Sequence, residues 1–348
     1  MTTTQNPKDS MKSTWTTWPR EQWNYHHKIL DFLDIYPVDP KTEVPVHSKG
    51  EKIPYFNEWS VHLWILFHAA IPLVLHQLCT SYTGHIFSPI AAFNLYFMAF
   101  NIIVVHEARI LRRLGHAYGF LDGDKHERDG IPDVGVAKVA KSLYKTTGSR
   151  LIAAVYLTYK PGELPIDMNW KWLFLEIGLY GVVLDFWFYW YHRLMHDVGG
   201  LWKYHRTHHL TKHPNSLLAA YADHEQEFFD MVGVPLMTYF TLKLMGLPMG
   251  FYEWWVCHQY IAFTEVLGHS GIRVYAPAAS TFTWLLQYFD AEIIVEDHDL
   301  HHRKGWRKSH NYGKQTRVWD RLFSTCHDRI ESARDNIDYE KPVSIPLL

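Results

Sequence analysis

The sequence has few cysteines and no excess of charge of one sign. Its three cysteines, Cys79, Cys257 and Cys326, stand far apart in 348 residues, and no C-x-x-C pair occurs. A disulfide framework or a thiolate zinc site is therefore not expected, and a reducing compartment suits the chain. Lysine and arginine (34) nearly balance aspartate and glutamate (36), so the charge gives no indication of nucleic acid binding.

The chain also lacks the signatures of a bound electron carrier. The glycines of the run 122–130 do not form the G-x-G-x-x-G of a dinucleotide site, and no other segment does. The C-x-x-C-H of covalent haem attachment is missing too. Electrons for any redox reaction must therefore come from another protein.

Histidine, in contrast, is abundant and tightly clustered, with 24 in the chain. His192 and His196 form an H-x-x-x-H pair, and residues four apart lie on one face of a helix, so the two imidazoles can bind one ion. Two H-x-x-H-H clusters follow, about ninety residues apart. Together these imidazoles exceed the needs of one tetrahedral ion, so the spacing predicts two metals. The clustered residues are His192, His196, His205, His208, His209, His298, His301 and His302.

Other histidines stand alone, and their ordinary interpretation is structural. His62, His68, His76 and His106 lie on apolar segments, where an isolated imidazole is more often a hydrogen-bonded core residue than a ligand. The clusters themselves do not identify the metal, because imidazole suits iron, zinc and copper alike.

Asp185 and Glu227 are the candidate acidic residues of the site. Asp185 lies seven residues before His192 and eleven before His196. At about 100° per residue, the three side chains fall within about 20° of one line along a helix. A carboxylate there can accept the second N–H of a ligand imidazole and fix its tautomer. Tyr189, one turn before His192, either lines the site or lies at a membrane interface.

Long apolar runs predict an all-α integral membrane protein with about four transmembrane helices and a helical, histidine-rich metal cap in the cytosol. Aromatic residues make up 16% of the chain, which suits the boundary between membrane and water. A soluble core remains an alternative for the early runs, because the mean hydropathy is only −0.20. The runs cover 61–79, 86–105 and 172–191, with 228–246 and 250–267 as a second hairpin.

Composition divides the chain into four parts. Residues 1–60 are a polar arm, which we expect to be an extended surface tail without an apolar signal segment. Residues 61–171 are a membrane hairpin followed by a basic loop over 106–150, which includes a solvated run at 122–130. Residues 172–327 form the catalytic domain, and 328–348 are a charged tail.

The order of the three histidine clusters resembles the fatty acid hydroxylase and sterol desaturase superfamily of integral-membrane di-iron oxygenases. The resemblance covers about residues 172–327. The sequence segments on which it rests are DFWFYWYHRLMH, LWKYHRTHH, LGHSG, EDHDLHH and NYGKQTRVWDRLFST. AAYADHEQE and GHSG look most like the sterol C4-methyl oxidase branch. The His-Pro-x-Glu of that branch is matched by His224 and Glu227, with Glu225 in place of the proline.

The resemblance extends the predicted ligand set. His269 matches a further ligand position, whereas a ligand that fatty acid 2-hydroxylases place four residues later is Arg273 here. His224 is expected to replace that ligand as the tenth. The expected ligands are His192, His196, His205, His208, His209, His224, His269, His298, His301 and His302.

The resemblance also implies a reaction, its cofactors and its partners. Two iron ions with O2 as co-substrate would hydroxylate or desaturate a C–H bond of a lipid, sterol or lipophilic metabolite. Cytochrome b5 and an NAD(P)H-dependent reductase would donate the electrons, and the multi-pass protein would lie in the endoplasmic reticulum membrane with its active site in the cytosol. Basic residues near the third cluster (Arg303, Lys304, Arg307 and Lys308) meet either the donor or anionic lipid headgroups.

Two other functions remain open at this point. Relatives of the superfamily use the same metals for aldehyde deformylation, chain cleavage or isomerisation. A non-enzymatic membrane protein that binds or moves zinc is the third possibility. Ligands of such a transporter tend to lie in mobile runs or within membrane helices, whereas these clusters follow apolar segments.

Overall fold

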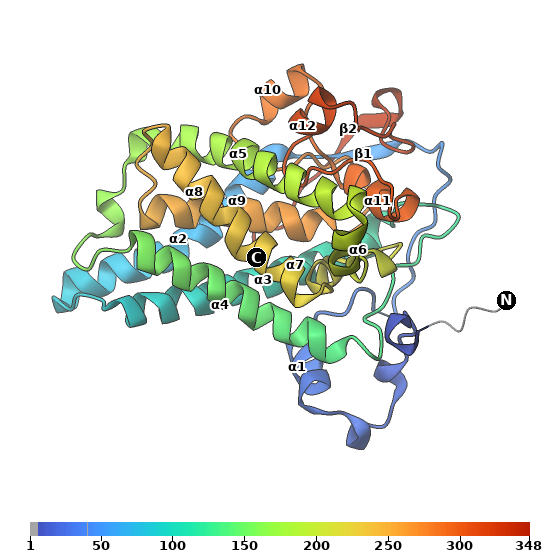
Figure 1. Cartoon of the computed structure of the whole chain (residues 1–348), viewed down its shortest axis with the longest axis horizontal. Helices are drawn as coiled ribbons and strands as arrows, with labels where there is room; N and C mark the ends of the chain where they lie inside the picture. The colour runs from blue at the N-terminus through green and yellow to red at the C-terminus, as the bar shows by residue number, and fades with distance from the viewer. Residues whose placement is uncertain (1–5, 40) are drawn as a thin grey trace.

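The protein is mostly helical, and its long helices run side by side towards one end of the molecule (Figure 1). The computed structural model describes residues 6–39 and 41–348; residues 1–5, at the start of the predicted arm, and residue 40 lie outside the described residues. The longer helices are α1 (Tyr25–Leu33), α2 (Glu58–Thr83), α3 (Pro89–Tyr118), α4 (Val136–Thr158), α5 (Trp170–Asp197), α8 (Val234–Leu244), α9 (Phe251–Gly268) and α11 (Val295–Lys304). Shorter ones are α6 (Gly199–His205), α7 (His224–Phe228), α10 (Thr283–Tyr288) and α12 (Val318–Leu322).

Within the described residues, α2, α3 and α5 are long and apolar enough to cross a membrane. They have 26, 30 and 28 residues, which at about 1.5 Å per residue exceed the roughly 30 Å of a hydrocarbon layer. Asn57 caps the start of α2, and Ser88 with Pro89 starts α3. Only 17% of the apolar window of α3 is buried, so its outer surface is suited to lipid.

The predicted second hairpin, over 228–246 and 250–267, has a different structure. Its first half is a π-helical turn (Phe229–Gly233) followed by the 11-residue α8, and neither α8 nor α9 is among the described helices that are long and apolar enough to cross a membrane. Helix α9 is buried along almost its whole length and contacts α2, α3, α4, α5 and α11. A helix that is apolar on all sides has the same sequence pattern whether lipid or protein surrounds it. The sequence therefore did not reveal that α9 is the central helix.

The expected basic loop over 106–150 is largely helical. Helix α3 continues to Tyr118 and α4 begins at Val136, so the connection covers only 119–135. Its run 122–130 is not simply solvated, because the side chain of Arg128 is buried against Asp299 at 2.7 Å. Two basic residues of α3 also have partners, since Arg112 forms an ion pair with Asp34 at 2.8 Å and Arg109 donates to the Leu33 carbonyl.

The N-terminal arm is packed rather than extended over the surface. Trp15, Trp23 and Leu30 are buried in a second core with Val139 and Tyr221, and α1 contacts α4. The indole N–H of Trp15 donates to the carbonyl of residue 131 at 3.1 Å. The arm therefore covers the surface beside α4 and is not a free tail.

A small parallel sheet joins the two ends of the described chain, so the fold is mostly helical rather than all-α. Strand β1 (Ile53–Phe56) pairs with β2 (Ile337–Val343) in register Ile53↔Ile337. Both of these isoleucines are buried. The predicted charged tail at 328–348 is therefore a structural element that returns to the start of α2.

Replacing Trp15 by alanine should test the packing of the arm. The change removes a buried indole and its hydrogen bond, so we expect it to lower the free energy of unfolding by about 3–5 kcal/mol. Thermal unfolding of the detergent-purified protein would measure the loss. Trp59→Ala is the control, because that indole is 83% exposed. Equal stability of the two variants would contradict the packed arm.

Candidate metal centre

Nine of the ten predicted ligands converge, and they do so as two separate groups. The ligand atoms within each group lie within 4.8 Å of one another, and all nine side chains are buried. In the part of the chain that the structure describes, the first group is His192, His196, His205, His209 and His301, and the second is His208, His269, His298 and His302.

The groups cut across the clusters seen in the sequence. Helices α5, α6 and α11 meet at one end of the molecule, and α9 ends there with His269 (Figure 1). On α11, His298 and His302 are four residues apart and share a face, whereas His301 is turned about 100° from His302. His301 therefore joins the first group while its neighbours join the second. The same division separates His209 from His208.

The spacing of the ring nitrogens suits metal coordination. His192 Nε2 lies 2.9 Å from His205 Nε2, and His209 Nε2 lies 2.9 Å from His301 Nε2. In the second group the Nε2 atoms of His269 and His298 are 2.9 Å apart. At metal–nitrogen distances of about 2.0–2.1 Å, neighbouring ligands lie about 3.0 Å apart in an octahedron and about 3.4 Å in a tetrahedron. Each group thus has the dimensions of one coordination shell.

Backbone carbonyls fix the orientation of five of these rings. Each carbonyl accepts the Nδ1–H of one imidazole, which leaves the Nε2 lone pair free for a metal. The segment 306–312, just after the third cluster, holds three rings of the first group. The pairs are His192 with Tyr312 O at 2.8 Å, His196 with Trp306 O at 2.7 Å, His301 with His310 O at 2.6 Å, His302 with Thr211 O at 3.1 Å and His269 with Glu265 O at 2.9 Å.

The surroundings also keep the imidazoles neutral. Burial, with the nearby ring of His269, lowers the pKa of His208 to about 3. Burial and the neighbouring imidazoles of His301 and His205 lower the pKa of His209 well below its usual value. Neutral imidazole is the form that ligates metals, so the rings can bind an ion at neutral pH without first losing a proton.

Asp185 does not have the contact that the helical spacing predicted. Among the described residues, its carboxylate accepts the backbone N–H groups of Lys314 at 2.8 Å and Thr316 at 2.9 Å and the Thr316 hydroxyl at 2.9 Å. The Nδ1–H of His192 goes to the Tyr312 carbonyl instead. Asp185 is therefore linked to His192 only through the segment 312–316, a connection that helical spacing in the sequence cannot reveal.

The structure brings His224 to neither group. Its side chain is 67% exposed, and its Nδ1 lies 3.3 Å from Glu227, whose side chain is 8% exposed. Arg273, at the position where the resemblance to fatty acid 2-hydroxylases implied a ligand, is buried in an ion pair with Glu331 at 3.0 Å. Tyr189 is buried as well, and its hydroxyl contacts Thr325 rather than a ligand ring.

The isolated histidines largely have the structural role expected of them. His62 hydrogen-bonds the Tyr260 hydroxyl at 2.9 Å, and His76 the Tyr96 hydroxyl at 3.2 Å. His68 Nδ1 donates to the backbone carbonyl of its own helix one turn earlier at 2.8 Å.

Three acidic residues inside the third cluster were not singled out from the sequence. Glu296, Asp297 and Asp299 are buried, although they share α11 with the ligands. Asp299 contacts Arg128 and Arg303, Asp297 contacts Arg329 at 2.8 Å, and Glu296 accepts the backbone N–H groups of residues 330–332. The E-D-H-D run shows that acidic residues lie next to the histidines on α11. Their basic and backbone partners could not be predicted, because these come from segments distant in the sequence.

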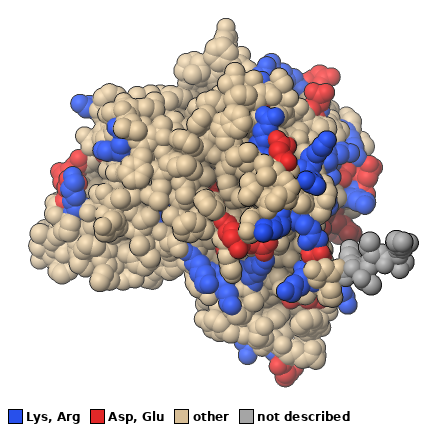
Figure 2. Space-filling model, viewed as in Figure 1, with Lys and Arg blue, Asp and Glu red and all other residues tan. Residues whose placement is uncertain are grey.

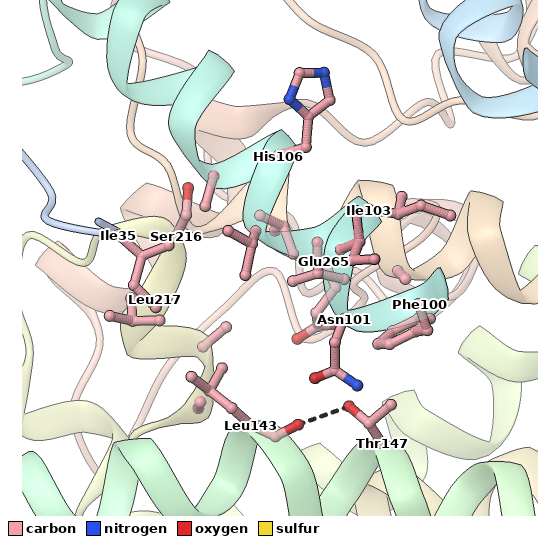
Figure 3. A pocket seen from close by; sticks show the side chains of 18 of the residues that line it. Ile35, Phe100, Asn101, Ile103, His106, Leu143, Thr147, Ser216, Leu217 and Glu265 are labelled. Carbon is pink, nitrogen blue, oxygen red and sulfur yellow. Dashed lines mark hydrogen bonds between the residues drawn. The ribbon is translucent and has the colours of Figure 1, made fainter. Parts of the chain in front are cut away.

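A cavity of about 620 Å³ approaches the second group through Glu265, whose carboxylate lies 3.9 Å from His269 Nδ1, although none of the nine grouped histidines lines it. Figure 3 shows its lining, with Phe100, Asn101 and Ile103 of α3 facing Leu143 and Thr147 of α4. Most of the lining is apolar, so the cavity suits a lipophilic molecule. Glu265 of α9 lines it, one helical turn before the ligand His269.

Known proteins define the class to which this fold and site belong. The model of the fatty acid hydroxylase family matches residues 177–325. A fatty acid hydroxylase, vlmA of Lecanicillium sp., is 45% identical over 86% of this chain and 85% of its own length. The chain belongs to the fatty acid hydroxylase family, which confirms the resemblance seen in the sequence.

Two other relatives are more distant. Alkylglycerol monooxygenase of Xenopus tropicalis is 27% identical over 56% of this chain and 37% of its own length. Methylsterol monooxygenase erg25B of Aspergillus fumigatus is 31% identical over 47% of this chain and 51% of its own length. Hydroxylases and monooxygenases are oxidoreductases, which confirms the predicted enzyme class. No solved structure matches the chain.

Changing Asp185 to asparagine should show how the loop controls the first group. The amide NH2 would replace an oxygen that faces backbone N–H groups, leaving buried donors unsatisfied at a cost of about 1–3 kcal/mol. We expect the Asp185 variant to bind less metal per protein chain than the wild type, as measured by elemental mass spectrometry. Asp197→Asn is the control, because that carboxylate lies on the same helix and is 49% exposed. Unchanged metal content in the Asp185 variant would refute the positioning role.

Proposed function

We propose that the protein is a membrane-bound di-iron oxygenase that hydroxylates or desaturates a C–H bond of a lipophilic substrate with O2 and external electrons. The observation that carries this proposal is the pair of buried imidazole groups beside an apolar cavity. The substrate class includes lipids, sterols and lipophilic secondary metabolites, as the names of the relatives suggest.

The donor set fits iron. The first group offers five imidazoles, one more than a tetrahedral zinc site uses, and among the described residues no cysteine belongs to either group. His196 Nε2 and His302 Nε2 are buried and have no hydrogen-bond partner in the described chain, as expected of nitrogens reserved for a metal. The nine grouped histidines are the proposed ligands, and His224 is the candidate for a tenth that a local movement of α7 would have to bring in.

The chain's own residues would orient the metal ligands and keep water away from the bound substrate. Two iron ions held there would supply the reduction of O2 and the removal of hydrogen from an unactivated carbon. The carbonyls of 306–312 orient the rings, and Asp185 holds the loop behind them. The apolar cavity excludes water from the bound substrate. Glu227, buried with one oxygen unpartnered among the described residues, is the second acidic candidate.

The proposed setting is the endoplasmic reticulum membrane, with the metal end in the cytosol. Figure 2 shows a broad surface almost free of charge over the middle of the long helices, with lysine and arginine mixed with acidic residues at the end that carries the metal groups and a few charged residues at the opposite tip. Basic residues prefer the cytoplasmic side of a membrane. α2, α3 and α5 would enter the bilayer, and α9 would be the fourth helix at that depth, shielded by them.

Electrons would come from cytochrome b5 and an NAD(P)H-dependent reductase. Lys304, Arg307 and Lys308 are exposed near the metal end and could meet an acidic donor. Arg303 has to be removed from the predicted docking surface, because its side chain is 4% exposed and pairs with Asp299 and Asp122. The same basic residues could instead contact anionic headgroups.

Alanine at one ligand from each group tests the di-iron proposal. His301→Ala and His208→Ala should each abolish O2-dependent turnover and lower iron content while the protein stays in membranes. His62→Ala is the control, since that ring bonds Tyr260 outside both groups.

Iron analysis and O2 uptake of the wild type separate the alternatives. Zinc without O2 uptake would favour a zinc-binding protein, and O2 chemistry with a cleaved or deformylated product would favour the other reactions. Full activity in either ligand variant would overturn the assignment of the centre.

The proposed docking surface for the electron donor is tested by measuring how turnover depends on ionic strength. Donor-driven turnover should fall steeply with added salt, and the slope should flatten in Lys304→Ser, Arg307→Ser and Lys308→Ser combined. Arg334→Ser is the control, because it is an exposed arginine paired with Asp290. If the triple variant keeps the salt slope but binds anionic vesicles more weakly, the residues contact lipid instead of a donor.

A further inference from the structure

Trp306 joins the surface of the molecule to the first group of histidines. It follows α11 at the metal end of the fold, where α5 and α6 also meet (Figure 1), and its side chain is 39% exposed. A single exposed aromatic residue is common on protein surfaces. What distinguishes Trp306 is the set of contacts on its inner side and the charges around it.

On the inner side, the indole of Trp306 packs on Trp202 of α6. The two ring centroids are 5.0 Å apart and the ring planes lie at 77°, which is an edge-to-face contact. Trp202 is only 9% exposed, and its ring centroid lies 5.2 Å from that of His196 and 5.6 Å from that of His209. A continuous row of aromatic rings therefore leads from the surface to ligands of the first group.

The main chain of Trp306 makes a second connection to the same group. Its carbonyl accepts the Nδ1–H of His196 at 2.7 Å. Electronic coupling falls less steeply through covalent and hydrogen bonds than across a gap between atoms, so this bond strengthens the path to a metal ion held by the ring. In the described chain, the rings of the second group contact other histidines instead of a tryptophan.

Two cations hold the indole of Trp306 in place. The Lys212 Nζ lies 4.9 Å from the centre of the ring and the Arg206 guanidinium lies 5.9 Å from it, within the range of a cation–π contact. Arg206 also pairs with Asp9. Lys212 also donates to the Gly305 carbonyl at 2.7 Å. Both cations are therefore fixed beside the ring by contacts of their own.

Further cations border Trp306 without an ion pair to any described residue. Arg307 and Lys308 follow it directly and are exposed, and Lys203 is exposed on α6. Arg307 extends across the start of α6, where a Cβ at Gly199 would come within 2.6 Å of its guanidinium. An apolar ring with a cationic border is complementary to a protein that has an acidic border around an exposed redox cofactor.

We propose that Trp306 is the entry point for electrons, where an acidic one-electron donor protein docks and from which each electron passes through Trp202 to the first metal site. Each encounter oxidises the cofactor of the donor by one electron and reduces one ferric ion to the ferrous state. Two encounters therefore supply the two electrons that one hydroxylation consumes. This inference rests on the proposed function for the identity of the ion, and it assigns the route that the electron takes.

The test measures reduction of the centre without O2 or substrate, so it does not depend on turnover. Iron-loaded protein would be mixed anaerobically with the reduced haem domain of cytochrome b5 at increasing concentrations, and the absorbance of the haem would report its oxidation. In Trp306→Leu the rate at saturating donor should fall at least about tenfold, because the aromatic path is interrupted. Reduction by dithionite, a small molecule that does not need this path, should proceed as in the wild type.

The same variant separates electron entry from a structural role. The hydrogen bond to His196 comes from the main chain, so Trp306→Leu should keep its iron, as measured by elemental analysis. Slower reduction by dithionite as well as by the haem domain would show a structural role and overturn the proposal. An unchanged rate at saturating donor would overturn it as well.

Trp190→Leu is the matched control. Trp190 is 36% exposed and lies two residues before the ligand His192, but its ring packs on Phe323 at 4.9 Å. The haem domain should reduce this variant as fast as the wild type. If it is slowed as much as Trp306→Leu, the loss does not depend on the aromatic path and the proposal is wrong.

A second variant and a product assay complete the design. If Trp306→Leu does not fold, Trp306→Phe keeps a smaller ring in its place and should lower the rate at saturating donor severalfold; an unchanged rate would refute the route. A wild type that is reduced through Trp306 but forms no oxygenated product would leave the route intact and count against the proposed reaction. Zinc in place of iron would refute both, because zinc has no redox chemistry.

Discussion

The backbone carbonyls of 306–312 are the interaction on which the centre depends. Nine neutral imidazoles must point their lone pairs inward without a covalent frame, and each ring can turn about its own bonds. The carbonyls of Tyr312 and Trp306 remove that freedom for His192 and His196 by accepting their second N–H. Carboxylates in turn hold this segment and the residues that follow it, since Asp320 accepts the N–H of Tyr312 at 2.8 Å and Asp185 accepts N–H groups of residues 314–316.

A second set of contacts fixes helix α11 from its other side. The helix carries ligands for both groups, so a small rotation would withdraw His301 from one group and His302 from the other. Asp299 and Asp297 prevent this by pairing with Arg128 and Arg329, which come from opposite parts of the chain. Buried ion pairs of this kind add little net stability, but breaking one is costly, so they specify orientation more than they stabilise the fold.

The sequence predicted which histidines come together more accurately than it predicted how the helices pack. Helical spacing selected eight of the nine histidines that the structure brings together, and the family resemblance added His269, because residues that share one face of a helix recur at fixed intervals. The division of adjacent His301 and His302 between two groups also follows from helical geometry. The burial of α9 and the contact of Asp185 with Lys314 could not be predicted, since both depend on segments distant in sequence. The exposed His224 shows the same limit of a local motif.

The pairing of β1 with β2 has a consequence for biogenesis. Residues 329–332 and strand β2 are synthesised after every histidine of the centre, yet they hold Glu296 and Asp297 of α11 and close onto the segment before α2. During translation the membrane helices can insert while α11 still lacks these partners. Helix α11 therefore gains the contacts that fix its orientation only after the C-terminal segment has been synthesised.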